Sequence, residues 1–180
     1  MPLDVKSAVA DALMDMLTRR GADKITVKDL VEACGISRQT FYYHFRDITD
    51  VVEWAARRAG ERILAESLQA AAPQEALGRF VSFTVESWHL IRRLLTSQRR
   101  DAMERIMLQS VRGYLEDLLS RRQGGPALNR EDWEAMLDFY ACGVTGLLLK
   151  NCGRQDLDQA RLADQLYRLL SERMLHPAAD

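Results

Sequence analysis

The sequence predicts an all-α protein in which an N-terminal three-helix head with a helix-turn-helix precedes a helical C-terminal body. The chain is rich in Ala, Leu, Glu, Arg and Met, which favour helix, and it has only four prolines and ten glycines in 180 residues. Apolar residues recur three and four positions apart along long stretches of the chain. No stretch alternates β-branched and polar residues as a half-buried strand does.

Composition limits the classes of function. Hydrophobic residues make up 47% and charged residues 28%, and the formal net charge of -1 supplies no overall attraction to nucleic acid. We find neither an export signal nor an apolar run long enough to cross a membrane, so we expect a cytoplasmic protein with no membrane partner. The three cysteines, Cys34, Cys142 and Cys152, form no CxxC pair, which favours a role as small buried hydrophobic residues over a zinc site. We therefore expect no metal or cofactor.

The first two helices of the head are predicted from their ends. Asp4 can cap a helix over residues 4–19, which carries one apolar stripe, and Gly21 follows where that helix should end. Thr26 predicts the N-cap of a second helix, with Asp29 three residues on as a short form of the capping box. The apolar residues of this helix lie at i, i+3, i+4 and i+7: Val27, Leu30, Val31 and Cys34.

A glycine turn leads to the third helix. Gly35 should end the second helix, and Ser37 is placed to cap a helix over residues 37–45. Two short helices joined by a turn with glycine indicate a helix-turn-helix. At about 100° per residue, Phe41 and Phe45 share the side that should pack in the head, opposite Tyr43. No acidic residue occurs between Ser37 and Arg46, although a solvated helix would normally include one.

The exposed side of this third helix has the chemistry that reads a DNA major groove. Gln can bond adenine and Arg guanine through paired hydrogen bonds, and a Thr methyl can touch a thymine methyl. Tyrosine hydroxyls, His44 and the backbone N–H groups at helix starts capped by Thr26 and Ser37 suit phosphates. The alternative is a plain amphipathic helix, which leaves two exposed tyrosines beside cations without a reason.

These residues resemble the N-terminal head of TetR-family regulators over residues 5–55. The resemblance rests on Ile25, Thr26, Val27, Leu30, Val31, Ala33, Cys34, Gly35, Ile36, Ser37, Thr40, Phe41, Tyr42, Tyr43, His44 and Phe45. A second pattern is similar to the short C-terminal domain of regulators of the dihydroxyacetone-kinase operon type: Phe139, Tyr140, Gly143, Gly146, Leu147, Asn151 and Gly153.

The resemblance implies a transcriptional regulator, typically a repressor, that binds a palindromic operator in double-stranded DNA as a homodimer. Residues 1–48 would form the DNA-binding domain and 49–180 the regulatory and dimerisation domain. Base contacts are implied for Lys28, Arg38, Gln39, Thr40 and Tyr43, and phosphate contacts for Thr26, Tyr42, His44 and Arg46. Many relatives carry lysine where this chain has Ile48, so one phosphate contact is missing or is replaced by Arg46 and the Thr49 hydroxyl.

The body is predicted to contain five further helices. They run from Asp47 or Thr49 to about Ala71, Gln74 to Ser97, Asp101 to Arg122, Arg130 to Asn151 and Leu157 to Leu175. Pro73 and the run Gly124-Gly125-Pro126 mark breaks, and Asn129 can cap the penultimate helix.

The last two helices are the expected dimer interface, and the resemblance implies that they pair with those of a second copy in a four-helix bundle. Their apolar surface is wider than a monomer core needs, and glycines on the penultimate helix permit close approach, although a two-sided core helix in a monomer remains an alternative. The expected interface residues are Tyr140, Gly143, Val144, Leu147, Leu166 and Leu170.

A small-molecule or protein effector is also expected if this chain acts as ligand-sensing relatives do. The candidates to line its pocket are aromatic and Met residues of the middle helices: Phe83, Trp88, Met103, Met107 and Tyr114. Ordinary core packing of these residues is the alternative.

An all-α enzyme is the main competing class. The histidines lack acidic partners at metal-ligand spacing apart from Glu86 and His89, and there is no phosphate-binding loop or nucleophile motif. We therefore expect no catalytic residues. A helical interaction module that does not bind DNA is a third class, and it predicts that changes at Tyr43 and Arg38 leave activity intact.

Overall fold

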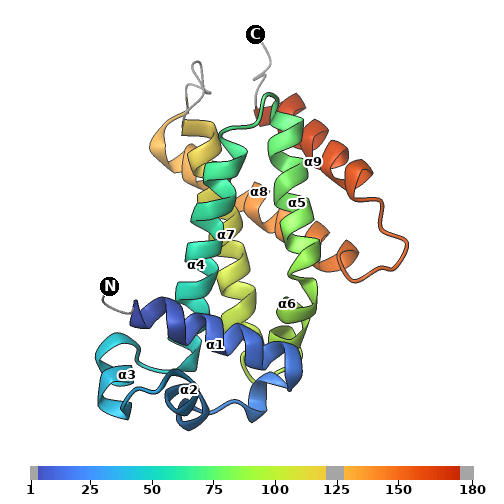
Figure 1. Cartoon of the computed structure of the whole chain (residues 1–180). Helices are drawn as coiled ribbons and strands as arrows, with labels where there is room; N and C mark the ends of the chain where they lie inside the picture. Colours follow the sequence, from blue (N-terminus) through green and yellow to red (C-terminus); the bar gives the residue numbers. More distant parts are fainter. Residues whose placement is uncertain (1–3, 121–127, 175–180) are drawn as a thin grey trace. The chain divides into compact units, whose positions relative to one another are not determined.

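The computed structural model describes residues 4–120 and 128–174, and within these ranges the chain is all-α. Helices follow one another in the order α1 (Val5–Arg19), the short 3-10 helix η1 (Ala22–Lys24), α2 (Val27–Cys34), α3 (Arg38–His44), α4 (Ile48–Ser67), α5 (Pro73–Glu86), α6 (Trp88–Leu95), α7 (Arg100–Ser120), α8 (Arg130–Asn151) and α9 (Gln159–Met174) (Figure 1). The predicted fold class is confirmed for the described part of the chain. The predicted break at 124–126 and the predicted helix end at Leu175 lie outside it.

The residues group into two compact units that alternate along the chain. Unit 1 comprises Met1–Ala59 and His89–Ile106, and unit 2 comprises Gly60–Trp88 and Met107–Asp180. Helices α4 and α7 contribute residues to both units. This grouping by contact differs from the division by function between residues 48 and 49, which stays a prediction.

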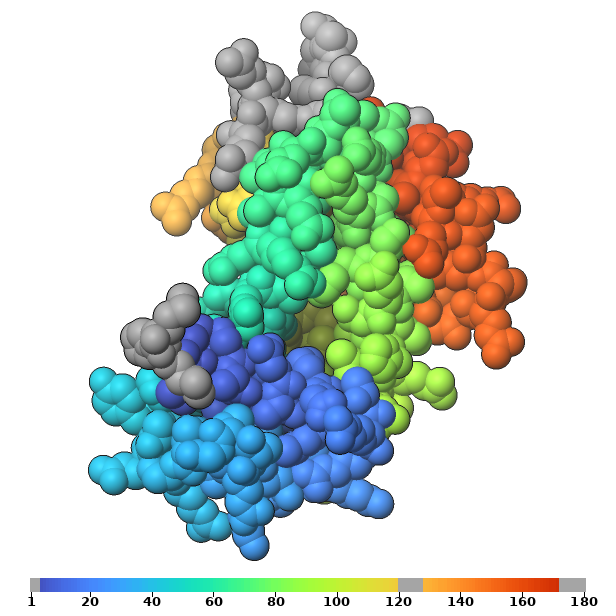
Figure 2. Space-filling model, viewed as in Figure 1, coloured from blue at the N-terminus to red at the C-terminus, as the bar shows by residue number. Residues whose placement is uncertain are grey.

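In unit 1, the head is built from α1, α2 and α3. Helix α1 packs against α2, and α2 packs against α3 (Figure 1). In Figure 2 these segments, coloured blue to cyan, form a continuous surface on the face in view. Apolar side chains from all three helices and from the start of α4 are buried: Val9, Leu13, Leu17, Leu30, Val31, Phe41, Phe45, Ile48 and Val51.

Unit 2 is built around α5, α8 and α9, with the last part of α4 and most of α7. Helices α5 and α9 lie side by side (Figure 1). Its core cluster draws on all five helices and includes Ile63, Leu77, Val81, Leu115, Leu137, Leu148 and Leu166. Arg112 on α7 pairs with Asp138 on α8 at 2.8 Å and also with Glu134 and Glu116.

Some predicted helix ends were wrong and others agree with the structure. The single helix expected from Gln74 to Ser97 is two helices, because the chain bends at Ser87, where no glycine or proline gives warning. Helix α4 ends at Ser67 rather than near Ala71. Helix α9 begins at Gln159, within two residues of the approximate start predicted at Leu157. The end of α1 at Arg19, with Gly21 just beyond it, agrees with the prediction.

Candidate nucleic-acid interface

Two capped helix starts and one glycine turn fix the orientation of α3. Thr26 and Asp29 form the predicted capping box: the backbone N–H of Asp29 donates to Thr26 Oγ1 at 3.3 Å, and that of Thr26 donates to Asp29 Oδ2 at 2.8 Å. Gly35 has φ of 63°, a left-handed conformation that a side chain disfavours. Ser37 Oγ accepts the backbone N–H of Thr40 at 3.0 Å, so the sequence predicted all three features correctly.

The inner side of α3 anchors it in the head. Phe41 is fully buried, and Phe45, the C-cap residue of the helix, is 3% exposed. The Phe45 ring meets Trp54 edge to face, with centroids 6.3 Å apart. These rings are therefore anchors, as their helical positions predicted, and they fix which side of α3 faces outward.

The outer side of α3 is polar and aromatic. Tyr43 is 85% exposed and Tyr42 58%, which is unusual for side chains of this size. Arg38 and Gln39 are also exposed, whereas Thr40 and His44 are half-buried. Six of the predicted contact residues thus lie on one short helix with their side chains wholly or partly open to a partner. His44 meets Tyr43 edge to face, with ring centroids 5.0 Å apart.

Some predicted contact groups already have partners within the head. The Thr26 hydroxyl donates to Asp29 at 2.7 Å, and those of Ser37 and Thr40 share a hydrogen bond of 2.8 Å. Hydrogen bonds from Thr26 hold the pKa of the Asp29 carboxyl below its usual value, with Arg20 adding to the effect. These hydroxyls hold helix starts in place, and their contacts with DNA stay predictions.

The cations beside α3 are paired with carboxylates. Lys28 lies 3.7 Å from Glu32, and the Arg46 guanidinium lies 3.4 Å from Asp50 while remaining 81% exposed. The hydrogen bond with Asp50 raises the pKa of Arg46. Ile48 is only 8% exposed, so the residue at the lysine position of relatives is part of the head core.

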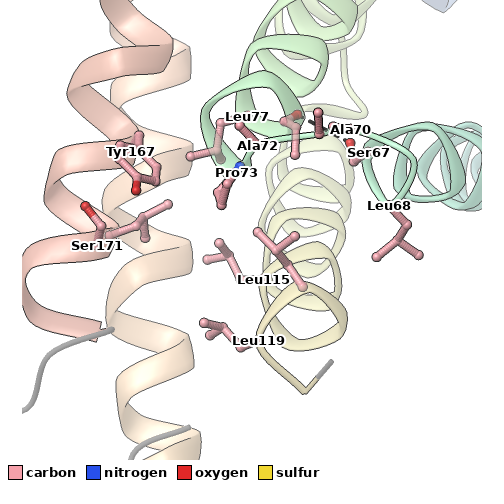
Figure 3. A pocket seen from close by; sticks show the side chains of 14 residues that line it. Ser67, Leu68, Ala70, Ala72, Pro73, Leu77, Leu115, Leu119, Tyr167 and Ser171 are labelled. Carbon is pink, nitrogen blue, oxygen red and sulfur yellow. Dashed lines mark hydrogen bonds between the residues drawn. The ribbon is translucent and has the colours of Figure 1, made fainter. Parts of the chain in front are cut away.

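A cavity of about 190 Å³ lies in unit 2 (Figure 3). Its walls come from the end of α4, the α4–α5 connection, α5, α7 and α9, and no charged side chain is among the residues that line it: Ser67, Leu68, Ala70, Ala71, Ala72, Pro73, Ala76, Leu77, Leu115, Leu118, Leu119, Tyr167, Leu170 and Ser171. The sequence did not predict this site, because its lining comes from four helices and one connection that lie far apart along the chain.

None of the five residues predicted to line a pocket lines this cavity. Tyr114 and Met107 are buried in unit 2, where the Tyr114 hydroxyl donates to the carbonyl of Ala76 at 3.2 Å. Met103 is buried in unit 1, and Phe83 and Trp88 pack against the core cluster of unit 2. Burial supports the alternative of core packing for these residues, and their contact with an effector stays a prediction.

The predicted dimer residues divide into two groups. Val144, Leu166 and Leu170 are buried in the core cluster of their own protomer, so their side chains have little surface left for a second copy. Tyr140 and Leu147 are half-buried, and Gly143 is exposed. The large apolar side chains that project from α8 and α9 are Phe139, 71% exposed, and Leu169, 57% exposed. Leu169 belongs to the apolar stripe that periodicity predicts on the last helix.

Within residues 4–120 and 128–174, no helix is long and apolar enough to cross a membrane. The same residues bring together no cluster of three or more His, Cys, Asp or Glu side chains that suits a metal ion.

The head therefore defines a helix-turn-helix module of the kind that binds nucleic acid. The family described as bacterial regulatory proteins, tetR family, matches residues 9–54. The HTH-type transcriptional regulator AlkX of Mycobacterium tuberculosis is 35% identical over 60 residues, which make up 33% of this chain and 28% of that protein. The similarity in sequence to this family therefore covers the head of the chain.

Solved structures extend the similarity of fold to the whole chain. The dihydroxyacetone kinase operon activator DhaS has a TM-score of 0.64 at 16% identity, with 96% of this chain and 97% of that chain covered. The TetR family repressor AlkX from Dietzia sp. strain DQ12-45-1b, described as implicated in biodegradation of n-alkanes, has a TM-score of 0.57 at 18% identity, with 93% and 96% covered. Identities this low establish a shared fold only.

Proposed function

We propose that this chain is a transcriptional regulator, a repressor, that binds a palindromic DNA operator as a homodimer. The observation that carries the proposal is the outer side of α3. It presents Gln39, Tyr42 and Tyr43 to solvent on a helix whose other side is anchored by Phe41 and Phe45. A short helix of this kind enters a major groove and touches base edges and flanking phosphates.

The proposed contacts follow from exposure and chemistry. Base contacts come from Arg38, Gln39, Thr40, Tyr43 and Lys28, and phosphate contacts from Thr26, Ser37, Tyr42, His44 and Arg46. The proposed DNA-binding domain is residues 1–48, and residues 49–180 serve regulation and dimerisation. The family consists of regulators rather than enzymes, which supports a role without catalysis.

Dimerisation is proposed through α8 and α9. Phe139 and Leu169 expose apolar surface that water does not favour, while Gly143 and Gly146 leave room for close approach of a second helix. A two-fold dimer would present two α3 helices to two half-sites, and a palindromic operator matches that symmetry.

The cavity of unit 2 is the proposed effector site. Its volume of about 190 Å³ is below the roughly 300–1,000 Å³ typical of pockets for larger ligands, so the ligand is small. Because no charged residue lines the cavity, the ligand is uncharged and largely apolar. Helix α4 contributes Ser67 to the cavity and begins at Ile48, just after α3, so a ligand that prefers one position of α4 would shift the population of DNA-binding states.

Selection of bound duplexes from a random pool tests DNA binding. The parent protein should enrich a palindrome, and Tyr43→Ala and Gln39→Ala should lose that consensus. Gln155→Ala, at an exposed residue between α8 and α9, is the matched control and should keep it. Failure of the parent to enrich any sequence would refute the proposal, as would an unchanged consensus for both α3 variants.

The effector site is tested with two probes that differ in charge. Saturating 1-butanol should weaken operator binding, whereas butanoate should not, because the site offers no cation to a carboxylate. Ala70→Leu should fill the cavity and remove the response to the alcohol while leaving DNA binding in place. Equal responses of the parent and Ala70→Leu would place the effector site elsewhere.

A further inference from the structure

Lys6 brings a positive charge to the C-terminal end of α3. It lies in the first turn of α1, and its Nζ is 5.9 Å from the centroid of the Phe45 ring, which belongs to the C-cap residue of α3. Such a contact between an ammonium and an aromatic ring is attractive. The side chain is half-buried, so its stem is supported by the head while part of it faces solvent.

Carboxylates surround the same corner of the head. Asp50 accepts the backbone N–H of Arg46 at 3.0 Å and the Arg46 guanidinium, and Asp47 accepts the backbone N–H of Asp50 at 2.9 Å. The bond from the Arg46 backbone is the main reason why the pKa of Asp50 is lowered, and the nearby charge of Lys6 contributes. These acids stabilise the start of α4 but would repel a phosphate.

Neighbouring groups do little to offset these acids. The first residue of α4, Ile48, is apolar and buried. Arg58 of the same helix is paired with Asp11 at 3.4 Å, and Arg105 is paired with Glu53 at 3.5 Å. A polyanion that approaches the end of α3 would therefore meet Asp47 and Asp50 unless Lys6 and Arg46 face it.

We propose that Lys6 and Arg46 together form a phosphate-binding site for the operator backbone at the corner between α1 and α4. The site rests on the proposed DNA-binding function and adds a contact from α1, outside the helix-turn-helix. Asp50 is a positioning residue, because its bonds to the Arg46 backbone and side chain hold a guanidinium that is still 81% exposed. The site lies at the end of α3 rather than on the side that bears Gln39 and Tyr43, so it contacts the backbone beside the groove and not the base edges.

The first test is the salt dependence of binding to the selected operator. Lys6→Gln should weaken binding roughly three- to tenfold on operator and random duplex alike, and it should reduce the slope of log K against log salt by about one. Lys6→Arg should keep the parent slope. Arg154→Gln, at an exposed residue between α8 and α9, is the matched control for loss of one positive charge. A parent-like slope for Lys6→Gln would overturn the proposal.

The second test needs no variant and is independent of folding defects. Lysines of the parent protein are acetylated with and without the selected duplex, and labelling is read by mass spectrometry. Lys6 should be labelled several-fold more slowly in the complex while Lys150 is unchanged. If the parent selects no duplex, the proposed function fails and the site with it. If the parent binds and Lys6 is labelled equally in both states, only the site is overturned.

Discussion

The head and the body of this protein specify their helices by different means. In the head, side chains of Asp4, Thr26 and Ser37 cap the three helices, and Gly35 supplies the one left-handed residue that the turn needs. In the body, Asn129 and Asp158 cap the starts of α8 and α9, but α5 begins after Ala72, whose side chain makes no cap, and ends at Ser87 without glycine. Each of the three head helices thus has a side-chain cap, whereas both ends of α5 lack a local signal and depend on packing in the core cluster.

The largest expected effect is that of Phe41→Ala. Phe41 has no exposed surface, and truncation of such a residue costs about 3–5 kcal/mol of unfolding free energy, a large part of a domain's stability. Operator binding should be lost with the head. Leu137→Ala, equally buried in the body, should lower stability by a similar amount without removing a residue of the head. Urea unfolding followed by circular dichroism measures the stability of each variant, and duplex binding measures the state of the head. Parent-like DNA binding by Phe41→Ala would contradict its role as the anchor of α3.

Two glycines should respond to alanine with opposite signs. At Gly35 the left-handed backbone costs an L-residue roughly 1–2 kcal/mol, so Gly35→Ala should lower the melting temperature. Gly78 lies within α5 with nothing within 4 Å of an added Cβ, and Gly78→Ala should gain about 1 kcal/mol from helix propensity. The same sign for both changes would contradict the account of the turn.

Removal of an N-cap side chain from the head should lower stability, and addition of one at the start of α5 should raise it. Thr26→Ala should lose about 1 kcal/mol, because the N–H of Asp29 loses its acceptor. Ala72→Ser should gain up to about 1 kcal/mol at the start of α5. Thermal unfolding of both variants checks the pair, and a neutral Thr26→Ala would show that local capping does not govern the head.

The hydrogen bonds between Thr26 and Asp29 also predict how the stability of the fold changes at acid pH. Bonds from Thr26 lower the pKa of Asp29 below its usual value of 3.8 in the folded state. The stabilisation by this carboxyl is therefore present above pH 3.8 and is lost as the pH falls through the lower folded pKa. Thr26→Ala should reduce this loss, and acid titration of the Asp29 carboxyl by NMR in both proteins follows it directly.

The smallest expected effect concerns the reactivity of the Cys152 thiol. Burial raises the pKa of the Cys152 thiol to about 11, so very little thiolate exists at neutral pH. Cys152 should resist iodoacetamide in the folded protein and react once urea unfolds the body, with peptide mass spectrometry as the measurement. Rapid alkylation of Cys152 in the native protein would contradict its place in the core cluster.

The same contrast explains which features were predictable from sequence. Caps and the glycine turn are signalled by single residue types at fixed spacing, so Thr26, Gly35, Ser37 and the N-cap Asn129 of α8 were found. The bend at Ser87 carries no such signal because it depends on packing. Periodicity assigned Val144 to an interface because it cannot distinguish a protomer's own core from a partner's surface. The cavity and the position of Lys6 beside Phe45 join residues far apart in sequence, which spacing along one helix cannot reveal.

Half-site spacing in the operator tests the central claim most directly. If two α3 helices of a symmetric dimer read two half-sites, their separation must match the DNA repeat of about 10–10.5 base pairs per turn. Insertion of about five base pairs between the half-sites moves one of them to the opposite side of the duplex and should reduce affinity to the level of random DNA, whereas insertion of a full turn should restore part of it. Affinity that is indifferent to the insertion would contradict recognition by a paired helix-turn-helix.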